Sequence, residues 1–104
     1  MDHLRYKTYR FDSEKNLKLL QMPDRQIGFQ EVIDEITSGN ALDIKKHFNQ
    51  IKYPHQYIIS VQIKGKVYSV PCVEEGEDGF FLKTIYPSSR ARDKFFPENK
   101  NNKS

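Results

Sequence analysis

The order of apolar and polar positions predicts one clear helix, from about Phe29 to Ser38. Its apolar residues recur at i, i+3, i+4 and i+7, the spacing of a single stripe along a helix: Phe29, Val32, Ile33 and Ile36. Acidic residues fall between them and are expected to face solvent. Gly39 follows and suits the left-handed residue that closes many helices. The pattern therefore predicts a helix that packs on a core through one face.

A second, earlier helix is predicted over residues 13–21. Asp12 or Ser13 is suited to accept hydrogen bonds from its first free N–H groups. Leu17 and Leu20 lie three residues apart and so fall on one face, which favours a two-turn helix. A proline two residues beyond the helix ends it.

Alternating apolar and polar residues predict strands in the second half of the chain. The expected strands are residues 42–48, 57–63, 66–74 and 79–86, with a less regular edge strand near residues 6–11. Lys64-Gly65 has the form of a two-residue hairpin turn. Pro71 lies inside one expected strand and predicts a bulge, a strand end or an edge, because proline has no N–H for the ladder. We expect an antiparallel sheet of three to four strands.

The last patterned stretch runs from Gly79 to Asp93. Its strand ends at Pro87, and Ser88 or Ser89 then caps a short helix that reaches about Phe95. Two N-terminal helices, an antiparallel sheet and a short C-terminal helix make an α+β fold. We expect a single domain over residues 1–97 and a disordered polar tail over residues 98–104.

Composition narrows the class of protein. The 104 residues suit one domain, and the apolar share of 37% with 30% charged residues indicates a small core. The single cysteine, Cys72, has no partner for an internal disulfide and lies in an apolar strand, so we expect it in the core. The chain has no apolar run long enough to cross a membrane and no signal segment, which predicts a cytoplasmic protein without a membrane partner.

The formal net charge is only +3, but the charges are unevenly placed. Residues 83–104 hold six Lys or Arg against two Asp or Glu, and residues 1–25 hold six against four. Residues 26–82 hold five against eight. Basic ends that meet in space suit a phosphate-bearing partner, and the acidic middle suits a basic one; a scatter of solvated charges is the alternative.

Three cations near the chain's end are the main candidates for catalysis. Lys83 lies in the strand and Arg90 and Arg92 in the short helix, so the turn at Ser88 and Ser89 is expected to bring them to one rim. Arginine matches phosphate with two parallel hydrogen bonds, and a lysine can carry a proton when it is desolvated. The alternatives are surface or fold-supporting arginines and a lysine whose stem only packs against the strand.

Further residues extend this candidate site. Lys15, Ser88, Ser89 and Lys94 are candidate RNA contacts, with solvated helix surface as the alternative for Lys15. His47 is a candidate acid or base, or else a histidine that caps a loop. No cluster of His, Asp, Glu and Cys has metal-ligand spacing, so we expect neither a metal nor a cofactor.

Several short motifs resemble one family when they are taken together. They are Phe11-Asp12 with Lys15-Asn16, Ile27-Gly28-Phe29 with Glu31, and Lys83-Thr84-Ile85 followed by Ser88 or Ser89, Arg90 and Arg92. A further set lies in the middle: Asp43, His47, Asn49, Tyr53-Pro54, Gln56, Val70-Pro71 and Val73-Glu74. In this order and spacing, over about residues 9–95, the chain resembles the BrnT-like toxins of bacterial type II toxin–antitoxin pairs, which have a RelE-type α+β fold.

The resemblance implies a toxin that acts on RNA, as a metal-independent endoribonuclease. It also implies a partner, a small antitoxin of the ribbon-helix-helix type. The chain departs from the family at Arg25-Gln26, where many members have a Lys-His pair. A catalytically silent module that binds a small partner protein is therefore the alternative function, and simple nucleic-acid binding is a third. Whether the chain forms a homodimer or a hetero-oligomer with the antitoxin is open.

Overall fold

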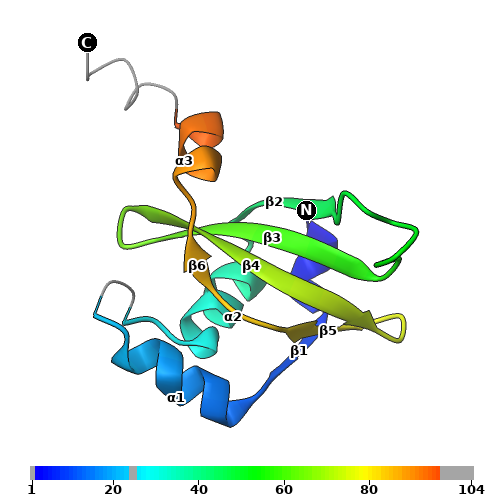
Figure 1. The fold of residues 1–104 in the computed structure, drawn as a ribbon, viewed down its shortest axis with the longest axis horizontal. Helices are drawn as coiled ribbons and strands as arrows, with labels where there is room; N and C mark the ends of the chain where they lie inside the picture. Colours follow the sequence, from blue (N-terminus) through cyan, green and yellow to red (C-terminus); the bar gives the residue numbers. More distant parts are fainter. Residues whose placement is uncertain (1, 24–25, 97–104) are drawn as a thin grey trace.

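The computed structural model describes residues 2–23 and 26–96. Over these residues the chain forms the following elements: η1 (Asp2–Tyr6), β1 (Thr8–Phe11), α1 (Ser13–Gln21), α2 (Phe29–Thr37), β2 (Ala41–Lys46), β3 (Gln56–Ile63), β4 (Lys66–Glu75), β5 (Gly79–Leu82), β6 (Tyr86–Pro87) and α3 (Ser89–Phe95). The predicted tail and Arg25 lie outside the described residues. Figure 1 shows α1 and α3 at opposite ends of the view, with the sheet between them.

The fold is α+β, as the sequence predicts, but its sheet is larger and mixed. The strand order is β1-β5-β4-β3-β2, and β6 pairs with β4 beyond the end of β5. The pairs from β2 to β5 are antiparallel, whereas β1 runs parallel to β5 with Tyr9 opposite Phe80. The predicted antiparallel strands are present as β2 to β5, and the sheet differs from the prediction by the addition of the parallel β1 and the short β6. A parallel edge strand is joined to its partner by a long stretch of chain, which no local pattern reveals.

The core lies on one face of the sheet, which we call the inner face, under α1 and α2. It joins residues of these helices to alternate residues of the strands: Leu19, Phe29, Val32, Ile36, Ile59, Val61, Val70, Cys72, Phe80 and Leu82. The predicted helix α1 is present, and it packs on the core through the fully buried Leu19, whereas Leu17 is 59% and Leu20 42% exposed. A nine-residue helix with few apolar residues can turn a different face inward when a neighbour anchors it.

That anchor is the contact between α1 and the start of α2. The side-chain oxygen Oδ1 of Asn16 accepts a hydrogen bond from the backbone N–H of Phe29 at 2.8 Å, which caps α2 from outside. Gly28 packs against the same side chain, and a Cβ on Gly28 would lie 2.6 Å from Oδ1 of Asn16. A side chain at position 28 would therefore have to displace Asn16, whose hydrogen bond ties α1 to the start of α2.

The predicted strand over residues 79–86 is interrupted. β5 ends at Leu82, and β6 begins at Tyr86 farther along β4. Pro71 of β4 lies opposite this interruption, where its carbonyl accepts from the N–H of Lys83 at 2.8 Å. In a strand the N–H and C=O of one residue point the same way, so the missing N–H of Pro71 also faces the interruption.

The interruption also changes which side chains face the core. Phe80, Leu82 and Ile85 are buried, so the alternation shifts by one residue between Leu82 and Ile85. The prediction that Lys83 lies in the strand is wrong, because Lys83 is exposed in the segment that links β5 to β6.

Candidate functional site

A row of polar residues crosses the outer face of the sheet. The register sets Asp43 of β2 opposite Ser60 of β3, Ser60 opposite Ser69 of β4, and Ser69 opposite Tyr86 of β6. Directly paired residues point to the same face of a sheet, so these four side chains share one side. The row lies opposite the core, on the side of the sheet that α3 covers.

The helix α3 is attached to the sheet at Ser88. The N–H of Ser88 donates to the carbonyl of Val67 at 3.0 Å, which continues the pairing of β6. Its hydroxyl oxygen accepts from the N–H of Ala91 at 3.1 Å, and its carbonyl accepts from the N–H of Arg92. Ser88 is therefore the N-cap that the sequence predicts, and it sets the direction of α3 over the sheet.

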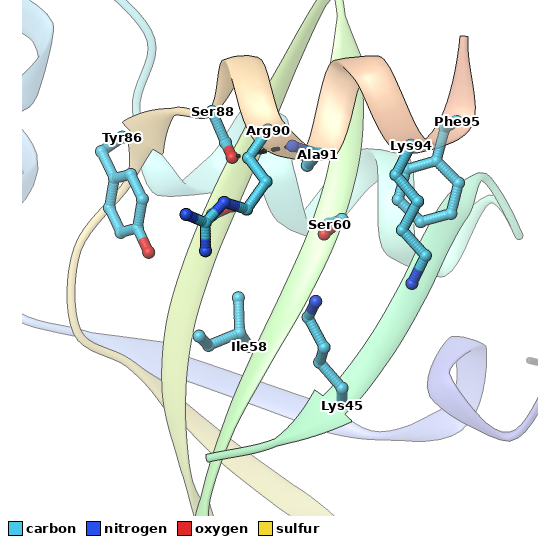
Figure 2. A pocket seen from close by; sticks show the side chains of 10 residues that line it. Lys45, Ile58, Ser60, Tyr86, Ser88, Arg90, Ala91, Lys94 and Phe95 are labelled. Carbon is cyan, nitrogen blue, oxygen red and sulfur yellow. Dashed lines mark hydrogen bonds between the residues drawn. The ribbon is translucent and has the colours of Figure 1, made fainter. Parts of the chain in front are cut away.

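Between α3 and the polar row lies a cavity of about 270 Å³, which we call the α3 pocket. Ten residues line it: Lys45, Ile58, Ser60, Ser69, Tyr86, Ser88, Arg90, Ala91, Lys94 and Phe95. Figure 2 shows the guanidinium of Arg90 and the ammonium groups of Lys45 and Lys94 directed into this space, two from the helix and one from β2. The pocket thus combines three cations with four hydroxyl groups, which are the donors that bind phosphate oxygens.

The charges of the α3 pocket are only partly balanced. The ammonium of Lys94 lies 3.5 Å from the carboxylate Oδ2 of Asp43, at one end of the polar row. Among the described residues, no hydrogen bond or ion pair engages the head groups of Lys45 and Arg90. Three cations against one carboxylate leave the pocket with a positive potential that attracts an anion.

A second cavity of about 240 Å³ lies at the other side of the start of α3. It is lined by Gly65, Lys66, Val67, Pro87, Ser88, Ser89 and Arg92, and we call it the turn pocket. The β3–β4 hairpin turn forms one wall, with left-handed φ values of 54° at Lys64 and 80° at Gly65, which confirms the predicted two-residue turn. Ser88 lines both pockets, so the two cavities are adjacent.

Arg92 is incompletely paired in the turn pocket. Its Nη2 donates to Oδ1 of the neighbouring Asp93 at 3.2 Å. Among the described residues, its Nε is a buried donor without an acceptor. A buried N–H without a partner costs about 1–3 kcal/mol, so an acceptor placed at this Nε would stabilise the guanidinium.

The structure separates the three cations that the sequence predicts at one rim. Arg90 lines the α3 pocket, Arg92 lines the turn pocket, and Lys83 lines neither. The reason is the helix itself, because residues two apart in a helix point to opposite sides. The predicted RNA contacts are also divided: Lys94 lies in the α3 pocket, Ser89 lies in the turn pocket, and Ser88 lines both.

The remaining two candidates lie elsewhere. Lys15 is half-buried on α1, on the other side of the sheet from α3. His47 lies in the loop after β2, where its ring stacks on Phe48 with centroids 4.6 Å apart. Its Nδ1 accepts from the backbone N–H of Asn49 at 3.0 Å. His47 therefore organises its loop and does not line the α3 pocket.

Cys72 is too deeply buried to act as a nucleophile. The side chain is fully buried on the inner face, and this burial raises the pKa of the thiol to about 12. Burial also raises the pKa of Tyr9, whose hydroxyl donates to the carbonyl of Leu4 at 2.7 Å. Within residues 2–23 and 26–96, no group of three His, Cys, Asp or Glu residues is placed to hold a metal ion.

Four polar lining residues were not among the predicted site residues: Lys45, Ser60, Ser69 and Tyr86. Ser60 shows a signal that could have found it, because it interrupts the apolar residues of β3 at a position facing away from the core. Lys45 and Tyr86 carry no such signal. They reach the pocket only through the register of β2 and β6, which depends on contacts distant in the chain.

Comparisons with protein-family models, with curated proteins and with solved structures found no match for this chain. In the described part of the chain, no helix combines the length and the apolar character that crossing a membrane requires.

Proposed function

We propose that this chain acts on RNA as the toxin of a toxin–antitoxin pair in the cytoplasm, and that the α3 pocket holds the RNA phosphate. One observation carries the proposal: Arg90, Lys94 and Lys45, from two separate elements, converge on one cavity beside a row of hydroxyl groups. Phosphate contacts supply most of the affinity of nucleic-acid binding. The family resemblance of the sequence adds the expectation of cleavage.

The chemistry proposed for this pocket needs no metal ion. Cleavage of RNA by its own 2′-OH requires positive charge on the phosphorane oxygens and groups that move protons. Arg90 and Lys94 would stabilise the developing charge from the helix side. Tyr86 and Lys45 are the ionisable groups that face the same cavity from the sheet, so the proton transfers are assigned to them.

Expression from a tightly controlled promoter tests this function. We expect the wild-type chain to arrest growth and degrade cellular RNA, and the Arg90→Ala variant to lose both effects. Lys83→Ala is the matched control, because the same sequence motif contains Lys83 but the structure places it outside the pocket. Full activity of Arg90→Ala, or normal growth and intact RNA with the wild type, would contradict the proposal.

A second candidate function is the binding of a small partner protein, such as the antitoxin. The observation that favours it is the loop between β2 and β3, where Phe48 is 94% and Ile51 98% exposed. Large apolar side chains held in solvent are typical of interaction sites. The loop follows the edge strand β2, whose free backbone groups can pair with a partner strand.

Copurification with the product of the neighbouring reading frame tests this candidate. We expect Phe48→Ser with Ile51→Ser to abolish the complex, while Leu17→Ser on α1 leaves it intact. Leu17 is the matched control, because it is another exposed apolar residue but lies on a different element. Equal retention of the partner by both variants would exclude the loop from the interface.

A further inference from the structure

We propose that the turn pocket holds a second phosphate of the same RNA strand, next to the phosphate in the α3 pocket. This inference rests on the proposed function and extends it. The ligand would be a single strand whose backbone crosses the chain at Ser88, the residue that lines both cavities. The substrate class is therefore an RNA strand with at least two successive phosphates.

The first argument is the chemistry of the turn pocket. Lys66 and Arg92 supply two cations, and Ser89 adds a hydroxyl. Neither Lys66 nor Ser89 forms a side-chain hydrogen bond or ion pair with any of the described residues. Their donors are available to an anion.

The second argument is the state of Arg92. Its side chain is 34% exposed, and among the described residues it pairs only with its sequence neighbour Asp93, while Nε is buried without an acceptor. A pair of this kind on the surface contributes little, about 0–1 kcal/mol. Turning the guanidinium toward a phosphate would exchange that weak pair for two parallel hydrogen bonds.

The third argument is that the two arginines of α3 lie on opposite sides of the helix. Arg90 and Arg92 point to opposite sides of α3, so they cannot clamp a single phosphate together. Two arginines on opposite sides of the helix start can instead hold two phosphates on either side of Ser88. The same spacing that rules out one shared rim provides two adjacent binding positions.

Binding of a labelled short single-stranded RNA, measured by fluorescence anisotropy over a range of KCl concentrations, tests the inference. For Lys66→Ala we expect about tenfold weaker binding and a salt slope reduced by about 0.7. A nucleoside monophosphate carries a single phosphate and can occupy only one of the two pockets at a time, so Lys66→Ala is expected to weaken its binding less than the binding of the RNA strand. Lys64→Ala is the matched control, because Lys64 lies in the same turn but lines neither pocket.

The outcomes separate the inference from the function on which it rests. If Lys45→Ala weakens RNA binding and both Lys66→Ala and Arg92→Gln leave it unchanged, the second phosphate position is wrong and the α3 pocket stands. If Lys66→Ala weakens the monophosphate as much as the RNA strand, the turn pocket is not a separate position. A wild-type chain that binds no RNA would overturn both.

Discussion

Neighbouring residues on β3 and β4 serve the two faces of the sheet in different ways. Toward α1 and α2, the register pairs Ile59 with Val70, and both side chains are fully buried. One residue along, Ser60 pairs with Ser69 under α3. Two helices bury the centre of the inner face, whereas one short helix leaves two cavities beside it on the outer face.

The difference between the faces follows from what each helix brings. The stripe of α2 is apolar, so its contact with the sheet excludes water and stabilises the fold. The seven residues of α3 include Arg90, Arg92 and Lys94, and none of the seven is buried. A helix of this composition covers the sheet without filling it. We infer that the inner face provides stability, and that the outer face is free to carry charge.

Substitution of adjacent isoleucines in β3 gives the largest expected contrast. Ile59→Ala removes a fully buried side chain from the inner face and is expected to cost about 2–5 kcal/mol of the free energy of unfolding. Ile58→Ala, on the wall of the α3 pocket, is expected to cost about 1 kcal/mol, because that side chain is only half-buried. Urea unfolding of both variants measures the difference, and equal losses would contradict the division of roles between the faces.

The junction of α1 and α2 tests how the inner face is closed. Gly28→Ala is expected to displace the Asn16 side chain and break its hydrogen bond to Phe29, because the new Cβ would lie 2.6 Å from Oδ1. We expect a loss of about 1–3 kcal/mol in the free energy of unfolding. Asn16→Ala, which removes the same cap without a clash, should lose about 1 kcal/mol. Thermal unfolding that leaves Gly28→Ala as stable as the wild type would exclude this packing constraint.

Local patterns predicted the elements that depend on neighbours in the chain. The stripe of α2, the turn at Lys64-Gly65 and the cap at Ser88 all satisfy their geometry within a few residues, and the structure has all three. The end of α1 was likewise predictable from Pro23. The alternation of β3 and β4 fixed their faces, since each side of an antiparallel strand has its own composition.

Features that depend on distant contacts were not predictable in the same way. The parallel pairing of β1 with β5 joins parts of the chain at opposite ends of the sequence. The interruption after Leu82 arises because β6 moves to a different part of β4, beyond Pro71. The α3 pocket depends on both local and distant contacts. The positions of Arg90 and Lys94 follow from the local helix, whereas those of Lys45 and Tyr86 depend on the register of the sheet.

The buried thiol allows a test of the inner face by pH. Because burial raises the pKa of Cys72 to about 12, the folded chain keeps this thiol protonated where the unfolded chain ionises. The stabilisation is complete below the ordinary thiol pKa and is lost as pH rises toward the folded value. At pH 10 we expect a loss of about 1 kcal/mol in the free energy of unfolding from this group.

This loss is measured by comparing the free energies of unfolding of the wild type and Cys72→Ala at several pH values. The variant has a lower stability at neutral pH but is expected to decline less between pH 8 and pH 10, because it lacks the thiol. Identical pH profiles for the two chains would show that the thiol is not protected by the core. Burial is the largest cause of the raised pKa values of Tyr9 and Tyr57 and is present in both chains, whereas the smaller contribution from the charge of Cys72 is absent from the variant.

Asp43→Asn is expected to have the smallest effect on stability. It tests whether the positive charge on the outer face governs RNA binding. The carboxylate of Asp43 lies 3.5 Å from the ammonium of Lys94 and offsets part of the positive charge in the α3 pocket. Removing that charge frees Lys94 for an anion, so RNA binding should strengthen by about threefold to tenfold and its salt dependence should increase. The free energy of unfolding should change by less than about 1 kcal/mol, because the pair is partly exposed.

Anisotropy titrations of a short RNA strand with the Asp43→Asn chain measure this gain. Asp34→Asn is the matched control, since Asp34 is an exposed acid on α2, which packs against the opposite face of the sheet. A general change in net charge would strengthen RNA binding equally in both variants, whereas a local effect on the α3 pocket is confined to Asp43→Asn. Weaker RNA binding in Asp43→Asn would mean that the carboxylate positions Lys94 rather than neutralising it, and the charge argument for this face would fail.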